Sequence, residues 1–547
     1  MLRVEGLRVE ATGGVVLVDG VDFAVVPGEV LGLIGESGAG KSTIGLACLA
    51  FARAGCKIAG GRILLDGTDL LTLTPEARRR VRGVRIAYVA QSAAASFNPS
   101  MPLLAQVCEG PLRHGLLDAA QARQQAIEMF DILGLPDPAR FGDRYPHEVS
   151  GGQLQRAMAA MAVACRPDVL VLDEPTTALD VTTQIDVLAH LKQLIARYGT
   201  AALYISHDLS VVAQMADRIL VLRHGRVVET GQTEAVLQAP QADYTRALVA
   251  ERRASLETSR VRPEPAAAPL LTVIGIKVVY GRRVAVNAAS LSIGRGEIVA
   301  VIGESGSGKT SLAHAIAGQV TASAGKLVFD GAPLSVVLAQ RRRDQLRRVQ
   351  LVLQVPDMAL NPRQSIAKIV GRPAQFYFGR RGAALRKTVA SLLASVGLDP
   401  AVATRLPGAL SGGQKQRVCI ARALAAEPDL IILDEATSAL DPLVAEEILV
   451  LLGQIQVSLG LSYLFISHDL GKVRRIADRV ILMRDGNILA DQSTEALFTA
   501  PAHPYARTLL AAVPQMRRGW LETAVVSIPR IESPRDAARA GVYKFTT

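Results

Sequence analysis

The sequence is poor in aromatic residues and in cysteine. Of its 547 residues, 4% are aromatic, one is Trp, and five are cysteines that form no C-x-x-C pair. Nucleic-acid grooves stack bases on aromatic side chains, so we expect no nucleic-acid partner. We interpret the cysteines as small buried hydrophobic residues in a reducing compartment, not as metal ligands or disulfides. They are Cys48, Cys56, Cys108, Cys165 and Cys419.

Long hydrophobic runs are also scarce. Charges interrupt Met1–Val25, so we expect no N-terminal signal peptide. The longest charge-free stretch, Ile448–Ser467, contains glycines, glutamines and serines, and we predict a helix, a turn and a buried strand there instead of a membrane span. The net charge of +11 is dispersed, which is typical of a solvated or membrane-proximal surface.

Two glycine-rich segments, Gly35–Thr43 (GESGAGKST) and Gly303–Ser311 (GESGSGKTS), fit the phosphate-loop pattern G-x-x-x-x-G-K-[ST]. Each follows an apolar strand and precedes a predicted helix, which is the context that such a loop requires. The backbone N–H groups of the loop and the dipole of the following helix both attract phosphate oxygens. The predicted ATP-binding residues here are Gly35, Glu36, Ser37, Gly38, Ala39, Gly40, Lys41, Ser42, Thr43, Gly303, Glu304, Ser305, Gly306, Ser307, Gly308, Lys309, Thr310 and Ser311.

Paired acids follow two further apolar strands, at Asp173-Glu174 and Asp434-Glu435. An aspartate at such a strand end can hold Mg²⁺, and the adjacent glutamate can polarise the attacking water. The hydroxyls of Ser42 and Thr310 would complete the metal site, and Lys41 and Lys309 would reach the β- and γ-phosphates.

The motifs recur in one order, which predicts two domains. The loop lysines are 268 residues apart, whereas the later motif pairs are 261 residues apart. Buried strands alternating with helices predict an α/β fold with a parallel sheet covered on both faces, and the segments 91–150 and 354–411 predict a helical subdomain in each half. We place the domains at 1–254 and 270–514, a Pro/Ala-rich linker at 255–269 and a tail at 515–547.

Between each loop and its acid pair lies SGGQ-x-Q-R, at Ser150–Arg156 and Ser411–Arg417. Such a segment is typical of a helix N-terminus that binds an anion. In this position it resembles the signature motif of ATP-binding-cassette ATPases, and the resemblance covers the chain except for the linker and the tail. It implies two tandem P-loop domains, each with a RecA-like core, an antiparallel β subdomain and a helical subdomain.

The resemblance also implies roles for further residues. Gln91 and Gln354 resemble the glutamine that senses Mg²⁺ and water and couples to membrane subunits, and His207 and His468 resemble the switch histidine at the γ-phosphate. Head-to-tail packing would close ATP at Lys41 with the second signature segment, and ATP at Lys309 with the first. The residues implied to contact ATP in this way are Ser150, Gly151, Gly152, Gln153, Ser411, Gly412, Gly413, Gln414, Asp180 and Asp441.

Local segments are similar to those of peptide and nickel importers. They are SFNP (96–99), ALNP (359–362), DYTRALVA (243–250) and HPYARTLLAAVP (503–514). This likeness implies the ATPase subunit of a bacterial importer, bound to two transmembrane permease subunits at the cytoplasmic face of the inner membrane and served by an extracytoplasmic solute-binding protein. Because both cassettes lie in one chain, we expect one copy per transporter.

The chain departs from the family pattern at a few positions. Tyr280 matches the adenine-stacking aromatic, but Thr12 stands there in the first half, which predicts a weaker grip on adenine. Ser92 and Val355 replace the acid that usually follows the glutamine, and the absence of cysteine after Cys419 predicts no iron–sulfur cluster. A soluble twin-cassette ATPase acting on the ribosome is the alternative, although its linker would be long, charged and helical. The transported solute stays open.

Overall fold

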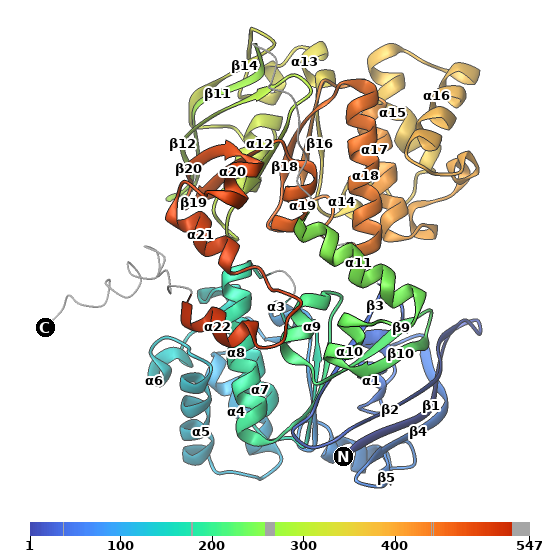
Figure 1. The fold of residues 1–547 in the computed structure, drawn as a ribbon, viewed down its shortest axis with the longest axis vertical. Helices are drawn as coiled ribbons and strands as arrows, with labels where there is room; N and C mark the ends of the chain where they lie inside the picture. Colours follow the sequence, from blue (N-terminus) through green and yellow to red (C-terminus); the bar gives the residue numbers. More distant parts are fainter. Residues whose placement is uncertain (37, 177–178, 258–267, 439, 441, 528–547) are drawn as a thin grey trace, which may run out of the picture.

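The computed structural model of the chain describes residues 1–36, 38–176, 179–257, 268–438, 440 and 442–527. It consists of two halves that repeat one architecture (Figure 1). Each half has a six-stranded, mainly parallel sheet, a four-stranded antiparallel sheet and a helical subdomain. The predicted α/β class, repeated in two halves, is therefore confirmed.

The first half contains ten strands in the described chain. They are β1 (Leu2–Ala11), β2 (Val16–Val25), β3 (Val30–Gly35), β4 (Cys56–Leu65), β5 (Thr68–Asp69), β6 (Ile86–Val89), β7 (Val169–Asp173), β8 (Ala201–Ile205), β9 (Arg218–Arg223) and β10 (Arg226–Gln232). Its helices are α1 (Lys41–Ala47), α2 (Pro75–Val81), α3 (Ala93–Ser96), α4 (Leu103–Arg113), α5 (Ala119–Ile132), α6 (Pro138–Phe141), η1 (Pro146–Glu148), α7 (Gly151–Val163), α8 (Val181–Tyr198), α9 (Leu209–Met215), α10 (Thr233–Gln238) and α11 (Asp243–Glu257).

The second half repeats this order. Its strands are β11 (Pro269–Tyr280), β12 (Arg283–Gly294), β13 (Ile298–Ile302), β14 (Ala324–Phe329), β15 (Ala332–Leu334), β16 (Val349–Val352), β17 (Leu430–Asp434), β18 (Ser462–Ile466), β19 (Arg479–Arg484) and β20 (Asn487–Ser493). Its helices are α12 (Lys309–Ala317), η2 (Leu338–Gln340), α13 (Arg343–Arg348), α14 (Pro356–Ala359), α15 (Ile366–Phe378), α16 (Gly382–Ser395), η3 (Pro400–Thr404), η4 (Pro407–Ala409), α17 (Gly412–Leu424), α18 (Pro442–Leu459), α19 (Leu470–Ile476), α20 (Thr494–Thr499), α21 (Pro504–Ala511) and α22 (Trp520–Ser527).

The central sheets position the functional segments. Their strand orders are β10-β9-β3-β8-β7-β6 and β16-β17-β18-β13-β19-β20, which match when one is read in reverse. The strands β3, β7 and β8 are buried throughout and pair in parallel, as near-continuous apolar runs predict. The phosphate loop, the acid pair and the switch histidine all follow such strands, so they meet at one edge of each sheet.

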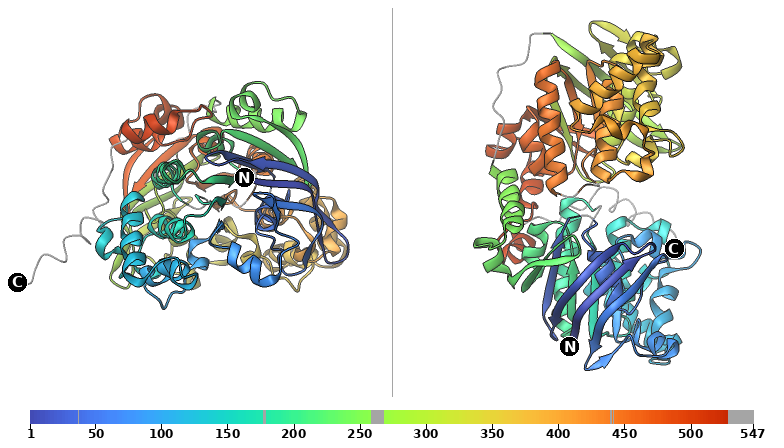
Figure 2. Two further views of the ribbon diagram at one scale, coloured as in Figure 1. Left: turned by 90° about the horizontal axis from the view of Figure 1, so that it is seen from below. Right: turned by 90° about the vertical axis from the view of Figure 1, so that its right-hand side faces the viewer.

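The two halves lie antiparallel to each other (Figure 1). The helical subdomain of the first half (α4, α5) is beneath the β subdomain of the second (β11, β12), and the helical subdomain of the second (α15, α16) is above the β subdomain of the first (β1, β2). Helix α11 and the C-terminal helices cross between the halves (Figure 2, right). This arrangement agrees with the expected head-to-tail order.

Two predicted boundaries differ from the structure. Helix α11 continues to Glu257, because Ser255, Leu256 and Glu257 extend a helix that is already formed, and β11 begins at Pro269, where a strand's first residue needs no ladder donor. The predicted linker 255–269 is thus shorter at both ends, and its residues 258–267 lie outside the described part of the chain.

The predicted tail 515–547 is not wholly a tail. Trp520, Leu521 and Ala524 of α22 are buried in the hydrophobic core of the first half. The side chain of Gln214 in α9 donates to the carbonyls of Gln515 and Arg517, at 2.5 and 2.9 Å. The second half therefore ends on the first half, a long-range contact that has no local sequence signal. Residues 528–547 are outside the described chain.

The charge-free stretch Ile448–Ser467 forms the end of α18, a turn and β18, as predicted. Among the described helices, α18 is the one whose length and mean hydropathy, 1.4, would allow it to cross a membrane. Seven of its residues, including Ile448 and Leu452, are buried, so its apolar character also serves the core of the second half.

Candidate active site: two duplicated nucleotide sites

The glycines at the start of each phosphate loop are required by close backbone packing. Gly35 has φ of 154°, and a Cβ on it would lie 2.1 Å from the carbonyl oxygen of Leu222. Gly303 has φ of 150° and would meet the carbonyl oxygen of Met483 at the same distance. Each loop is therefore pressed against the neighbouring strand, and only glycine fits.

The loop lysines are held by the backbone carbonyls of their own loops. Nζ of Lys41 donates to the oxygens of Gly35 and Glu36 at 2.7 and 2.8 Å, and Nζ of Lys309 donates to those of Gly303 and Glu304 at 2.8 and 2.7 Å. Burial lowers the pKa of Lys309, opposed by Glu435, Asp180, Asp434 and Glu304. Both ammonium groups are thus placed inside the curled loop, where a phosphate would be bound.

Each loop hydroxyl contacts the aspartate at the end of the neighbouring strand. Oγ of Ser42 donates to Oδ1 of Asp173 at 3.0 Å, and Oγ1 of Thr310 donates to Oδ1 of Asp434 at 3.1 Å. Hydroxyl and carboxylate oxygens are ligands that Mg²⁺ prefers. Among the described residues, no group of three or more His, Cys, Asp or Glu side chains could hold a metal ion, so bound phosphate would have to supply further ligands.

The glutamate after each aspartate is fixed on both carboxylate oxygens. Nε2 of Gln91 donates to Oε2 of Glu174 at 2.9 Å, and Nδ1 of His207 lies 3.0 Å from Oε1. In the second half the same bonds join Gln354 and His468 to Glu435, at 2.8 and 3.2 Å. Burial raises the pKa of Glu435, but His468 and Lys309 outweigh it and hold the pKa below its ordinary value. Glu435 is therefore kept as a carboxylate, the form that accepts a proton.

Both glutamates adopt a backbone conformation that sequence reasoning does not anticipate. Glu174 has φ of 48° and Glu435 has φ of 47°, in the left-handed region that is uncommon for residues other than glycine. The amide of each donates to the next strand, to Ile205 at 2.9 Å and to Ile466 at 3.1 Å. The same uncommon conformation at both positions shows that the two halves share this backbone turn directly after the strand that ends in aspartate.

The signature segments form helix N-termini as predicted. Oγ of Ser150 accepts from the amide of Gln153, and the side chain of Gln153 accepts from the amide of Ser150. Ser411 and Gln414 make the same capping box on α17.

The first half reaches the second phosphate loop through the segment that begins α8. Asp180 caps α8 through the amide of Thr183 at 3.0 Å, and the hydroxyl of Thr182 donates to Oε1 of Glu304 at 3.2 Å. In return, Leu443 of the second half packs against the core of the first. Ser37 and Asp441, two of the predicted ATP-binding residues, lie outside the described residues.

A cleft of about 760 Å³ separates the halves and contains residues of both sites. It is lined by Gly35, Glu36, Gln91 and His207 of the first half, and by Lys309, Thr310, Gln354, Glu435 and His468 of the second. Ser150 and Ser411, both exposed, do not line the described cleft. The closing of each site by the opposite signature segment therefore stays a prediction.

The two sites differ where adenine would bind. Tyr280 lines the cleft with 48% of its surface exposed. Thr12, its counterpart, donates its hydroxyl to the carbonyl oxygen of Gly55 at 2.8 Å and offers no ring. Arg283 lines the same part of the cleft near Gly306, while the first half has Val15 at the matching position.

Sequence reasoning missed several residues that support the sites. The hydroxyls of Tyr244 and Tyr505 accept from the amides of Glu36 and Glu304 at 3.1 and 3.2 Å. Both tyrosines belong to segments that we used only to assign a subfamily. Their separation of 261 residues, the same as for the histidines, was the signal that could have found them.

The strand-end aspartates have different partners in the two halves. The hydroxyl of Tyr88 donates to Oδ2 of Asp173 at 2.5 Å. Leu351 occupies the matching position in the second half, where Nε2 of His314 lies 3.4 Å from Oδ2 of Asp434 instead. Burial raises the pKa of Asp173, as does the charge of Glu174, against the bonds from Tyr88 and Ser42.

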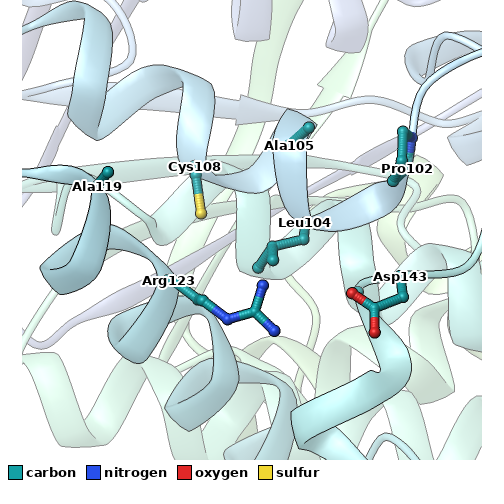
Figure 3. A pocket seen from close by; sticks show the side chains of 8 residues that line it. Pro102, Leu104, Ala105, Cys108, Ala119, Arg123 and Asp143 are labelled. Carbon is teal, nitrogen blue, oxygen red and sulfur yellow. The ribbon is translucent and has the colours of Figure 1, made fainter.

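A second cavity, of about 520 Å³, lies in the helical subdomain of the first half (Figure 3). It is lined by residues of α4 and α5, including Cys108, with the guanidinium of Arg123 directed into it and Asp143 beside it. None of its lining residues is a predicted site residue.

Two family comparisons match the chain. The family described as "ABC transporter" matches residues 18–177 and 286–438, once in each half. The family described as "Oligopeptide/dipeptide transporter, C-terminal region" matches residues 492–541. The second match contains Tyr505 and helix α22, which contact the second phosphate loop and the first half, respectively.

Curated relatives match nearly the whole chain. A peptidoglycan transport ATP-binding protein of Agrobacterium fabrum is 40% identical over 514 residues, covering 91% of this chain and 93% of that protein. A glutathione import ATP-binding protein of Salmonella typhimurium is 37% identical over 550 residues, covering 93% and 87%. Among solved structures, cbiO1 of Clostridium perfringens is 29% identical with a TM-score of 0.39, covering 43% of this chain and 92% of that chain.

Proposed function

The chain belongs to the ABC transporter family, and from that premise we propose that it is the ATP-hydrolysing subunit of an importer for peptides or peptide-like solutes, glutathione among them. Its cassettes bind ATP. The observation that carries the proposal is the match to the oligopeptide/dipeptide transporter C-terminal region. This region contributes to the second phosphate loop, because the hydroxyl of Tyr505 accepts a hydrogen bond from the amide of Glu304.

We assign the chemistry to the residues that the duplicated geometry brings together. Lys41 and Lys309 bind the β- and γ-phosphates. Ser42 with Asp173, and Thr310 with Asp434, would hold Mg²⁺, assisted by Gln91 and Gln354. The donor set fits this ion, since Mg²⁺ is usually held by one or two protein oxygens together with substrate phosphates. When bound, Mg²⁺ neutralises charge on the β- and γ-phosphate oxygens.

Hydrolysis then depends on Glu174 and Glu435. Each carboxylate orients a water molecule and accepts its proton as the water oxygen attacks the γ-phosphorus and the bond to the β–γ bridging oxygen breaks. The switch histidine and the glutamine hold the carboxylate on both oxygens, so little reorganisation is needed when the water binds.

ATP is sandwiched between the halves in this proposal. Ser411–Gln414 close the site at Lys41, and Ser150–Gln153 close the site at Lys309, each presenting a helix N-terminus to the γ-phosphate. The antiparallel arrangement and the bond from Thr182 to Glu304 support this order. Closure then needs the cleft between the halves to narrow.

The partners follow from the same proposal. Two transmembrane permease subunits bind the cassettes at the cytoplasmic face of the inner membrane, and an extracytoplasmic solute-binding protein delivers the solute. The ribosomal alternative is not favoured, because transport ATP-binding proteins match more than nine tenths of the chain.

Co-purification tests the proposal directly. The full-length chain is tagged and isolated from membranes in mild detergent, and its partners are identified by mass spectrometry. Two polytopic permeases at about one copy each per chain would support the proposal. Recovery with ribosomal subunits and no permease would contradict it and favour the alternative.

A further inference from the structure

Helix α11 ends the first half but contacts α18 and α19 of the second (Figure 1). Its residues Glu251 and Arg252 line the cleft between the halves. Neither belongs to a motif that the sequence analysis identified. A charged pair in this cleft costs desolvation energy, so its surroundings must compensate.

Groups of both halves compensate the desolvation energy of Arg252. Its Nε donates to Oγ of Ser210 at 2.7 Å, and its guanidinium lies 3.6 Å from Oδ2 of Asp208 in the first half. Burial lowers the pKa of Arg252, but Asp208, and then Asp469 of the second half, outweigh this and raise it. The side chain is 15% exposed.

Asp208 and Asp469 occupy equivalent positions in the two halves, each beside a residue of a predicted site. Each directly follows a switch histidine, His207 or His468, and each caps the next helix. Burial raises the pKa of Asp469, but Lys472, Arg252 and His468 bring it down to about 2. Both aspartates are therefore rigidly placed by their helix caps, and both line the same cleft as Arg252.

A single path thus joins the two hydrolytic glutamates. It runs from Glu174 through His207 and Asp208 to Arg252, and then across the cleft, which Arg252 and Asp469 both line, to His468 and Glu435. Asp469 caps α19, and α11 contacts this helix. We propose that Arg252 is a positioning residue that couples the two switch histidines, so that the two sites hydrolyse ATP in concert. This rests on the proposed roles of His207 and His468.

The segment of the second half that corresponds to α11 has no such charged residues at the matching positions. Residues 512 and 513 of the second half match Glu251 and Arg252 at the spacing of 261, and they are Ala512 and Val513. Ala512 is buried, and Val513 lines the cleft. The coupling arginine is therefore present in the first half and not at the matching position of the second, so no arginine at that position repels it in the cleft.

The neighbouring charges strengthen the contact of α11 with the second half. Burial raises the pKa of Glu251 to about 7, opposed by Arg252 and Arg475 and reinforced by Glu446 and Asp469. Arg475 in turn pairs with Glu446. Because Glu446 of α18 and Arg475 of α19 act on Glu251, the residue next to Arg252, a shift of either element changes the electrostatic environment of this part of α11.

The test compares two neighbouring arginines in the full-length chain assembled with its permeases in lipid vesicles. Arg252→Met removes the bridge. Arg253→Met is the matched control, because Arg253 donates to the carbonyl of Leu237 within its own half. We expect Arg252→Met to lower the Hill coefficient for ATP from near 2 toward 1 and to lower kcat about tenfold, with KM changed less than about twofold.

Two further variants keep the proposal falsifiable. Arg252→Lys restores a positive charge and recovers at least half of the lost Hill coefficient and kcat. Asp469→Asn keeps the helix cap but removes the second-half charge, and it reproduces the loss of cooperativity even if Arg252→Met misfolds.

The proposal is overturned if Arg252→Met and Asp469→Asn keep the wild-type Hill coefficient, or if Arg253→Met lowers it equally. A wild-type Hill coefficient of 1 also overturns it, while ATP-driven uptake by the same vesicles would leave the proposed function intact. Cooperative hydrolysis that Arg252→Met abolishes, in vesicles that take up no solute, would instead support the coupling and overturn the proposed function.

Discussion

The two halves of the chain share their reacting groups and differ in what surrounds them. The glutamine and histidine bonds to Glu174 measure 2.9 and 3.0 Å, and those to Glu435 measure 2.8 and 3.2 Å. By contrast, Tyr280, the predicted adenine-stacking residue, belongs to the second half, and Arg252, the proposed bridging residue, belongs to the first. Equal chemistry with unequal surroundings indicates two hydrolytic sites that are controlled differently.

The helical subdomains differ even more. Residues 93–149 contain seven acidic and four basic residues, a net charge of −3, whereas 356–410 contain two acidic and eight basic residues, a net charge of +6. Lys368 and Arg372 stand where the first half has Ala105 and Glu109. Ala105 lines the cavity of the first subdomain (Figure 3). The two outer surfaces are therefore not interchangeable.

The largest expected effect tests whether the two sites contribute equally to ATP hydrolysis. Glu174→Gln and Glu435→Gln each remove a proton acceptor that is held in the same way, so each should lower the ATPase kcat at least about 100-fold. Steady-state phosphate release by the assembled complex measures this. The exposed pair Glu234→Gln and Glu495→Gln serves as control.

Equivalence would be lost if one of the two variants hydrolysed ATP at the wild-type rate while the other was inactive. In that case one site would be regulatory, and the shared geometry would not be sufficient for turnover.

The next effect concerns the contact that the C-terminal segment makes with the first half. Trp520 is 5% exposed in the core of the first half, so Trp520→Ala should lower the free energy of unfolding of that half by about 3 kcal/mol. Calorimetry should show the transition of the first half at lower temperature and that of the second unchanged. Val526→Ala, at an 88% exposed position of the same helix, should change neither. Equal shifts of both transitions would contradict the assignment.

A smaller effect tests the predicted difference between the two sites in how they bind adenine. Tyr280→Ala should weaken ATP binding at the second site about tenfold, because stacking on a base contributes about 1–3 kcal/mol. Thr12→Tyr should strengthen binding at the first site. Equilibrium nucleotide binding to the hydrolysis-deficient chain measures both, and Tyr280→Phe should bind like wild type. If Tyr280→Ala bound ATP normally, the tyrosine would not be the platform.

The smallest effect concerns pH. The pKa of Glu251 is raised to about 7 in the folded chain. Between about pH 4.5 and 7 the carboxyl group is ionised in the unfolded chain but still protonated in the folded one, so the folded chain loses stability as pH rises through this range. Glu251→Gln should therefore raise the free energy of unfolding on the order of 1 kcal/mol at pH 8, since partial exposure reduces the effect, and leave it unchanged below pH 4.5.

Thermal unfolding at several pH values measures this. Glu522→Gln is the opposite control, because the pKa of Glu522 is lowered by Lys192 against its burial, and its replacement should destabilise at pH 8. A stabilisation by Glu251→Gln that did not vary with pH would exclude the titration as its cause.

Local patterns in the sequence predicted the parts of the site that depend on local chemistry. The glycine loops and the acid pairs were found because each motif lies within a few residues of a buried strand, and the strand order then brings them together. The switch histidines came from the resemblance to the ATP-binding-cassette family.

Contacts between distant segments were not predictable in this way. The linker was placed from composition, and α11 runs into it because residues 255–257 extend a helix that is already formed. Trp520 is buried in the opposite half, and Arg252 lines the cleft between the halves, so no periodicity or motif marks either residue. The left-handed backbone at Glu174 also depends on the neighbouring strand.

Transport by a reconstituted complex tests the central claim most directly. The chain, its co-purified permeases and the solute-binding protein are placed in lipid vesicles with ATP on the cassette side, and uptake of radiolabelled glutathione and short peptides is measured. The account predicts uptake that requires ATP and the binding protein and is abolished by Lys41→Ala or Lys309→Ala. ATP hydrolysis that proceeds without solute movement, and that ribosomes stimulate instead of the binding protein, would contradict it.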